Sequence, residues 1–183
     1  MQRFDESSAV CQIFTYKEGL LSPFAHDLRI GVASFTVEVG GSEHFIKASF
    51  NARSLQVDCA MVDGKERPDL LSQGDREEIN RSIEREVLHS DSYPLITLIS
   101  SSVRKDDSRY LVNGTLTLHE KPREITFTVR KEDGTHYVSD VRLHLPDFGI
   151  KPFSTLFGTV KIKPDILIHI RIPTGRIEEA SLS

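Results

Sequence analysis

The sequence predicts an all-β, antiparallel fold with a single helix, and three observations predict it. Apolar and polar residues alternate with a period of two along most of the chain, which indicates a sheet with one buried and one wet face. Short polar turns, several with glycine, separate these segments. Only residues 75–89 have the spacing of an amphipathic helix instead. Many strands with hairpin turns favour a β-barrel or a β-sandwich.

Before the helix, alternation and turn residues predict four strands. The turn at Gly40-Gly41-Ser42 separates the second of them from the third. Residues 61–71 are charged and irregular, so we expect a loop there. The four predicted strands are residues 9–16, 28–39, 44–51 and 54–58.

The helix is predicted from a start signal and an apolar stripe. Ser72, followed three residues later by Asp75, is typical of a helix N-terminus. Ile79, Ile83 and Val87 then recur every fourth residue among charged neighbours. A narrow stripe of this kind indicates one amphipathic helix that lies across an end or an edge of the sheet.

After the helix, two alternating runs joined by the polar turn 105–108 predict a hairpin. Within each run the apolar residues share one face and the polar residues share the other, so the apolar set must point into the protein. Gly114 fits a bulge or close packing; a second interpretation is that its missing side chain leaves room for a ligand. The apolar set is Ile96, Leu98, Val112, Gly114, Leu116 and Leu118.

Further alternating segments complete the predicted sheet. Phe127 and Val129 share one face of the next strand, and the turn at residues 132–134 (Glu-Asp-Gly) is a strong hairpin signal. In the final strand, Ile168 and Ile170 belong to a face made only of isoleucine. These segments are residues 124–130, 136–145, 159–163 and 166–172.

Length and composition place the chain among globular domains. Its 183 residues suit one domain with a sizeable core. A net charge of −4 argues against a nucleic-acid-binding protein, and no apolar run is long enough for a transmembrane helix. The 2 cysteines have no Cys-x-x-Cys spacing, so reduced, partly buried thiols are expected. The N-terminus has no apolar core of a signal peptide, and we therefore expect a cytoplasmic protein.

The candidate catalytic and metal-binding residues do not form a recognisable pattern. Ser22, His26 and Asp27 lie close in sequence, but no nucleophile elbow accompanies them, and adjacent strand residues point to opposite faces. No histidine has metal-ligand spacing to another histidine or a cysteine. We therefore predict neither an enzyme nor a bound metal or cofactor. The histidines at 119, 144 and 169 are expected on the solvated surface.

Several motifs together resemble the YceI-like family. They are the acidic Tyr-Pro junction at 90–94, Gly114, the Leu-Thr-Leu-His run at 116–119, Lys121-Pro122, and the Asp-Phe-Gly-Ile run at 147–150. The resemblance implies a lipocalin-like fold, an antiparallel up-and-down β-barrel of about eight strands. A barrel of that size has an interior that can hold one small ligand. We expect this domain at 9–173, between an N-terminal tail at 1–8 and a polar C-terminal tail at 174–183.

The same resemblance implies a function. Members of the family enclose long isoprenoid lipids, so we expect non-enzymatic binding of an apolar ligand such as a polyisoprenoid or a quinone tail. The alternative is a protein-interaction or regulatory module with a filled barrel and no small-molecule ligand, and a homodimer is left open. The expected ligand-binding residues are Ile96, Leu98, Val112, Gly114, Leu116, Leu118, Phe127, Val129, Phe148, Ile168 and Ile170.

Overall fold

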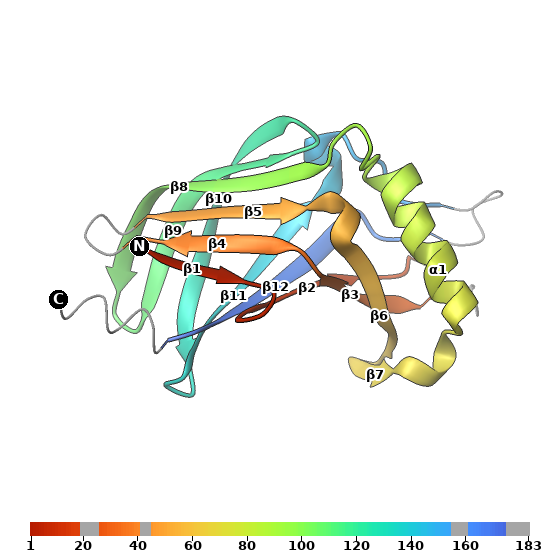
Figure 1. Ribbon diagram of the computed structural model, residues 1–183, viewed down its shortest axis with the longest axis horizontal. Coiled ribbons are helices and arrows are strands. Elements are labelled where there is room, and N and C mark those ends of the chain that lie inside the picture. The colour runs from red at the N-terminus through yellow and green to blue at the C-terminus, as the bar shows by residue number, and fades with distance from the viewer. Residues whose placement is uncertain (19–25, 41–44, 155–160, 175–183) are drawn as a thin grey trace.

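The computed structural model describes residues 1–18, 26–40, 45–154 and 161–174. Within these ranges, a single antiparallel sheet of twelve strands curls into a half-barrel, with one α-helix at the end of the molecule away from the N-terminus (Figure 1). The predicted all-β fold with one helix is therefore confirmed. The predicted count of about eight strands is not, because the sheet has twelve.

The strands follow one another around the sheet in the order β1-β4-β5-β8-β9-β10-β11-β12-β2-β3-β6-β7. Those before the helix are β1 (Gln2–Asp5), β2 (Val10–Thr15), β3 (Asp27–Val32), β4 (Phe35–Val39), β5 (Ile46–Asn51), β6 (Leu55–Val62) and β7 (Lys65–Arg67). Those after it are β8 (Leu95–Asp106), β9 (Arg109–Leu118), β10 (Lys121–Glu132), β11 (His136–His144) and β12 (Asp165–Pro173). Short 3-10 turns are η1 (Ala52–Ser54), η2 (Pro68–Leu70) and η4 (Leu145–Phe148).

Two sharp corners bend the sheet. The first breaks the segment predicted as one strand at 28–39 into β3 and β4, and the second, η1, separates β5 from β6, which were predicted as separate strands. Backbone hydrogen bonds cross both corners, from Ala33 N–H to the Ser54 carbonyl and from Asn51 N–H to the Ser34 carbonyl, each 3.0 Å. The β4–β5 pair and the β3–β6 pair therefore continue each other around the corner. Because these pairs lie near opposite ends of the sheet order, the corners keep the sheet curled.

Residues 1–8 were predicted as an N-terminal tail outside the sheet, and this prediction is wrong for residues 2–5. Residues Gln2–Asp5 form β1, which pairs antiparallel with β4 and places Phe4 opposite Val37. Phe4 is 0% exposed. One apolar residue in a four-residue strand leaves no alternation to detect. At the other end, Thr174 is buried and donates through its backbone N–H to the Thr135 carbonyl (2.9 Å), while the rest of the predicted tail lies outside the described residues.

The segment predicted as a loop at 61–71 is partly ordered as strand. β6 continues to Val62, and β7 pairs back onto it across the turn at Asp63–Gly64, where both residues have positive φ. Of the strand predicted at 159–163, residues 161 and 162 make isolated bridges and 159–160 lie outside the described residues. The hairpin turns predicted at 105–108 and 132–134 are confirmed.

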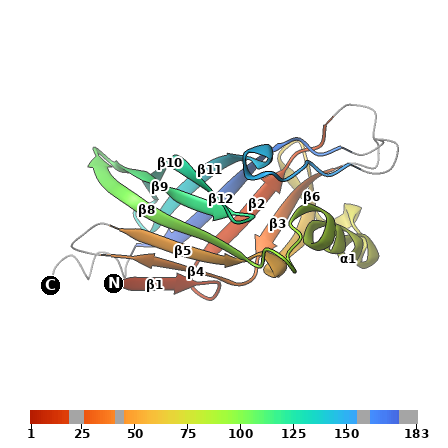
Figure 2. The same ribbon diagram turned by 90° about the horizontal axis from the view of Figure 1, so that it is seen from above.

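The predicted helix is present as α1 (Gln73–Ser82), which continues directly into a π-helical turn, η3 (Ile83–Val87). A capping box begins it, because Asp75 N–H donates to Ser72 Oγ (3.2 Å) and Ser72 N–H donates to Asp75 Oδ2 (2.8 Å). The Asn80 side chain accepts a hydrogen bond from Val57 N–H of β6 (2.8 Å), so the helix packs beside that strand (Figure 2). None of the described helices is long and apolar enough to cross a membrane.

Candidate functional site

The inner face of the curled sheet is apolar because the inward positions of neighbouring strands match in register. Leu98 of β8 stands opposite Ala48 of β5 on one side and Leu116 of β9 on the other. On β12, Ile168 stands opposite Val141 of β11 and, on its other side, a β2 residue. Two cavities, of about 770 Å³ and about 620 Å³, lie against this face.

The larger cavity, here called the turn-side cavity, extends toward the β8–β9 turn, which contributes Asp107 and Ser108 to its rim. Tyr110 and Tyr137 meet edge to face there, with ring centroids 5.9 Å apart. The rest of the lining is mainly aliphatic and aromatic. It includes Val37, Val39, Ala48, Leu98, Val103, Ile125, Phe127, Val129, Val141, Ile170 and Ile172.

The smaller cavity, the helix-side cavity, lies beneath α1 and η3. The predicted apolar stripe of the helix, Ile79, Ile83 and Val87, forms part of its wall. The opposite wall comes from the sheet, so the helix covers this end of the hollow as the stripe predicted. The sheet residues of this lining include Cys11, Ile13, Leu28, Ile30, Val32, Leu55, Ile96, Leu118 and Ile166, and η4 adds Leu145.

Four residues border both cavities and form what we call the waist: Phe50, Leu116, Leu143 and Ile168. They come from β5, β9, β11 and β12, strands spread around the curl of the sheet. These four side chains therefore lie between the two cavities, which together make up the apolar hollow.

A model of the YceI-like domain family matches residues 13–173. The chain belongs to the YceI-like family. Because the match spans most of the described sheet and the helix, it covers both cavities of this YceI-like domain. No curated protein matches the sequence.

Solved structures share the fold at low sequence identity. The structure of Burkholderia cenocepacia BcnA has a TM-score of 0.64 and 13% identity, over 92% of this chain and 98% of that one. A polyisoprenoid binding domain from Saccharophagus degradans has a TM-score of 0.56 and 9% identity, over 90% and 91%. The Campylobacter jejuni YCEI protein has a TM-score of 0.55 and 13% identity, over 85% and 86%. At these identities the likeness shows the fold.

Most of the residues expected to bind a ligand line the cavities of the YceI-like domain. Leu98, Phe127, Val129 and Ile170 line the turn-side cavity. Ile96 and Leu118 line the helix-side cavity, while Leu116 and Ile168 belong to the waist. Their role in binding stays a prediction.

Three of the expected residues do not line either cavity. Val112 is 0% exposed and Phe148 is buried among the core residues. At Gly114, a Cβ atom would lie 2.7 Å from the Ile99 carbonyl oxygen and 2.9 Å from Ser100 Cα. The interpretation that Gly114 leaves room for a ligand is therefore wrong, because the backbone of β8 fills that side at a bulge between Ser100 and Ser102.

Sequence reasoning missed lining residues on β4, β5 and β11. Val37 and Val39 alternate within the strand predicted at 28–39, and that alternation was the available signal. Phe50 belongs to an equally clean alternation in β5, whereas Leu143 gave a weaker signal because β11 places the polar Ser139 among its lining residues. Which of these side chains face each other depends on the curl of the sheet.

The titratable side chains that line the helix-side cavity include Cys11, His26, Asp75 and Glu78. Burial raises the pKa of the Cys11 thiol to about 12, so this thiol stays protonated at neutral pH. Asp27 Oδ1 accepts a hydrogen bond from Lys17 N–H (2.8 Å), and Ser22 lies outside the described residues. Cys11 and Cys59 are both buried and free, as expected. Across the described ranges, no three His, Cys, Asp or Glu residues are grouped to hold a metal ion.

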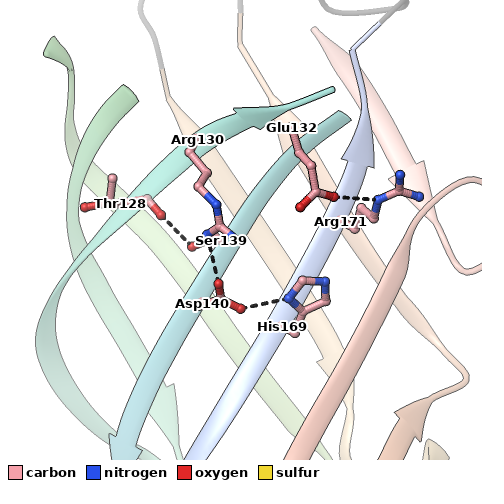
Figure 3. A network of polar contacts seen from close by, with 7 residues as sticks. All are labelled: Thr128, Arg130, Glu132, Ser139, Asp140, His169 and Arg171. Carbon is pink, nitrogen blue, oxygen red and sulfur yellow. Dashed lines mark hydrogen bonds and ion pairs between the residues drawn. The ribbon is translucent and has the colours of Figure 1, made fainter. Parts of the chain in front are cut away.

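A polar network joins three strands on the other face of the sheet (Figure 3). Asp140 of β11 accepts from His169 Nδ1 of β12 and from the Arg130 guanidinium of β10, both at 2.8 Å. Burial alone would raise the pKa of the Asp140 carboxyl, but the hydrogen bonds from His169 and Arg130 outweigh it and lower that pKa. Ser139, the preceding residue, lines the turn-side cavity, so Asp140 points to the outer face.

Proposed function

We propose that this YceI-like domain binds a long apolar lipid, such as a polyisoprenoid chain or a quinone tail, and carries it without changing it chemically. The observation that carries the proposal is the divided apolar hollow, with cavities of about 770 Å³ and about 620 Å³. Pockets of a few hundred cubic ångströms or more that are mainly apolar are typical ligand sites.

The energetics of burial support this ligand class. Full burial of one methylene contributes about 0.8 kcal/mol, so a five-carbon isoprene unit contributes up to roughly 4 kcal/mol. Several such units outweigh the roughly 4–15 kcal/mol cost of association. A lipid chain therefore needs no charged anchor to stay bound in this lining.

A non-enzymatic role is consistent with the state of the polar groups near the ligand space. The thiol of Cys11 is a poor nucleophile while its pKa is about 12. The carboxylate of Asp27 already accepts a hydrogen bond from Lys17 N–H. The solved relative whose name describes a polyisoprenoid binding domain supports the same ligand class.

The alternative, an interaction module with a filled barrel, has less support. It requires side chains to occupy the interior, whereas the inner face of the sheet borders two cavities. No feature of the described residues favours this alternative over lipid binding.

The test is native mass spectrometry of the freshly purified full chain, followed by organic extraction of the same sample. We expect an extractable apolar lipid and a bound mass that disappears after extraction. The delipidated protein should then take up solanesol, a long isoprenoid alcohol. A chain that carries no lipid and takes up none would overturn the proposal.

A further inference from the structure

The waist (Phe50, Leu116, Leu143 and Ile168) divides a hollow that would otherwise be continuous. A slender chain that fills both cavities must pass these four side chains. A short chain can fill one cavity and leave the waist unchanged. The waist is therefore the place where the length of an apolar ligand can be distinguished.

Phe50 is the largest side chain of the waist and the only aromatic one. It stands directly opposite Phe35 in the β4–β5 register, and the two rings stack with centroids 6.0 Å apart and planes at 24°. Phe35 is 4% exposed and therefore held in place by its neighbours, so the Phe50 ring packs against a fixed partner. Stacked aromatic pairs hold their rings in place. Phe50 also borders both cavities.

We propose that Phe50 selects the ligand by chain length, acting as the partition between the two cavities. This inference rests on the proposed lipid-binding function. A long chain displaces the ring from its stacked position and recovers that cost by filling the second cavity. A short chain cannot recover it, so it occupies one cavity only. Phe50 thereby imposes a penalty on chains that span both cavities, and the size of its side chain sets how strongly long chains are preferred over short ones.

The experiment uses the delipidated full chain and two isoprenoid alcohols with the same hydroxyl end, the short farnesol and the long solanesol. Their dissociation constants and stoichiometries are measured for the wild type, Phe50→Ala and Phe50→Trp. We expect the preference for solanesol over farnesol to rise by about tenfold in Phe50→Ala and to fall by about tenfold in Phe50→Trp. In the wild type, one solanesol should displace farnesol from both cavities.

The matched control is Ile99→Ala, because Ile99 is 56% exposed and lines neither cavity. It leaves both cavities and the waist intact, so the solanesol-to-farnesol ratio should stay at the wild-type value. If Phe50→Trp does not fold, Ile168→Phe narrows the same waist from β12 and should lower the ratio in the same way.

The outcomes separate this inference from the proposed function. If the wild type binds neither alcohol, lipid binding itself fails. If it binds both, and the ratio in the Phe50 variants equals that in Ile99→Ala, lipid binding stands and the role of Phe50 is overturned. A ratio that moves only in the waist variants supports the inference.

Discussion

At Gly114 the missing side chain lets two strands come closer than any other residue would allow. The bulge in β8 brings the Ile99 carbonyl oxygen to 2.7 Å, and Ser100 Cα to 2.9 Å, from where a Cβ atom would stand. Real Cβ atoms do not tolerate such distances to backbone. Glycine inside a strand is the usual solution where another backbone approaches this closely.

Gly114→Ala should therefore destabilise the fold rather than fill a ligand space. Strand β8 would have to move, and overpacking of this kind costs about 1–3 kcal/mol. Urea unfolding measures the loss. The control is Gly74→Ala in α1, where a Cβ would meet only Ser72 Oγ at 3.8 Å; this change should stabilise by about 0.4–1 kcal/mol. Equal stability of Gly114→Ala and the wild type would contradict the close approach.

His119 makes contacts with the end of the helical segment that no local sequence pattern predicted. The carbonyl oxygen of Leu88 accepts a hydrogen bond from His119 Nε2 (2.6 Å), and the His119 ring lies 4.2 Å from that of Tyr93. The alternation of β9 predicted a solvated histidine, but this ring is partly buried against the end of the helical segment. The contact joins residues 31 apart, a separation that periodicity cannot report.

At the scale of elements, the start of the helix and its apolar stripe could be predicted from the sequence. The end of the helix and the corners of the sheet could not. Ser72 and Asp75 form the capping box that the sequence indicated, and the stripe of Ile79 and Ile83 faces the hollow. The π-helical turn after Ser82 and the corner at Ala33–Ser34 carry no such local signal. Both depend on tertiary packing, which overrides local preference.

The network around Asp140 ties three strands together through one carboxylate. His169 lies directly opposite Asp140 in the β11–β12 register, and Arg130 reaches it from β10. Because the pKa of Asp140 is lowered from 3.8, folding favours the charged form. The stabilisation is then fully present above the unfolded pKa and is lost as the pH falls through the lower folded pKa.

Asp140→Asn should accordingly be less stable than the wild type at neutral pH, by under about 1 kcal/mol, since partly exposed ion pairs contribute little. Below the ordinary carboxyl pKa of 3.8 the difference should shrink as Asp140 becomes protonated in the wild type. Urea unfolding across this pH range measures both. A difference that does not change with pH would exclude the charge of Asp140 as its source.

For the whole molecule, the alternation of β8, β9, β10 and β12 was enough to predict the apolar inner face, and eight of the expected residues line the cavities. The hollow itself was not predictable. Whether Phe50 meets a neighbour or borders a cavity depends on the radius of the curl, which the corners at Ala33–Ser34 and η1 help to set. Local periodicity reports the direction of a side chain but not the distance to the opposite wall.

The hollow also links ligand binding to the stability of the whole fold. A ligand that binds only the folded chain stabilises it by about 2.7 kcal/mol at a free concentration of 100 times its dissociation constant. At roughly 2–4 °C per kcal/mol for a domain of this size, solanesol should raise the melting midpoint of the delipidated protein by roughly 5–10 °C.

Leu116→Trp places a larger side chain in the waist and should nearly abolish that rise. Overpacking should cost about 1–3 kcal/mol of stability, so the variant still folds if the wild type has ordinary stability. Ile99→Trp is the matched control, because Ile99 is 56% exposed and lines neither cavity; its solanesol-dependent rise should equal that of the wild type. Differential scanning calorimetry with and without solanesol measures both variants. If solanesol raises the midpoint of Leu116→Trp as much as that of Ile99→Trp, the lipid does not pass the waist and its site lies elsewhere.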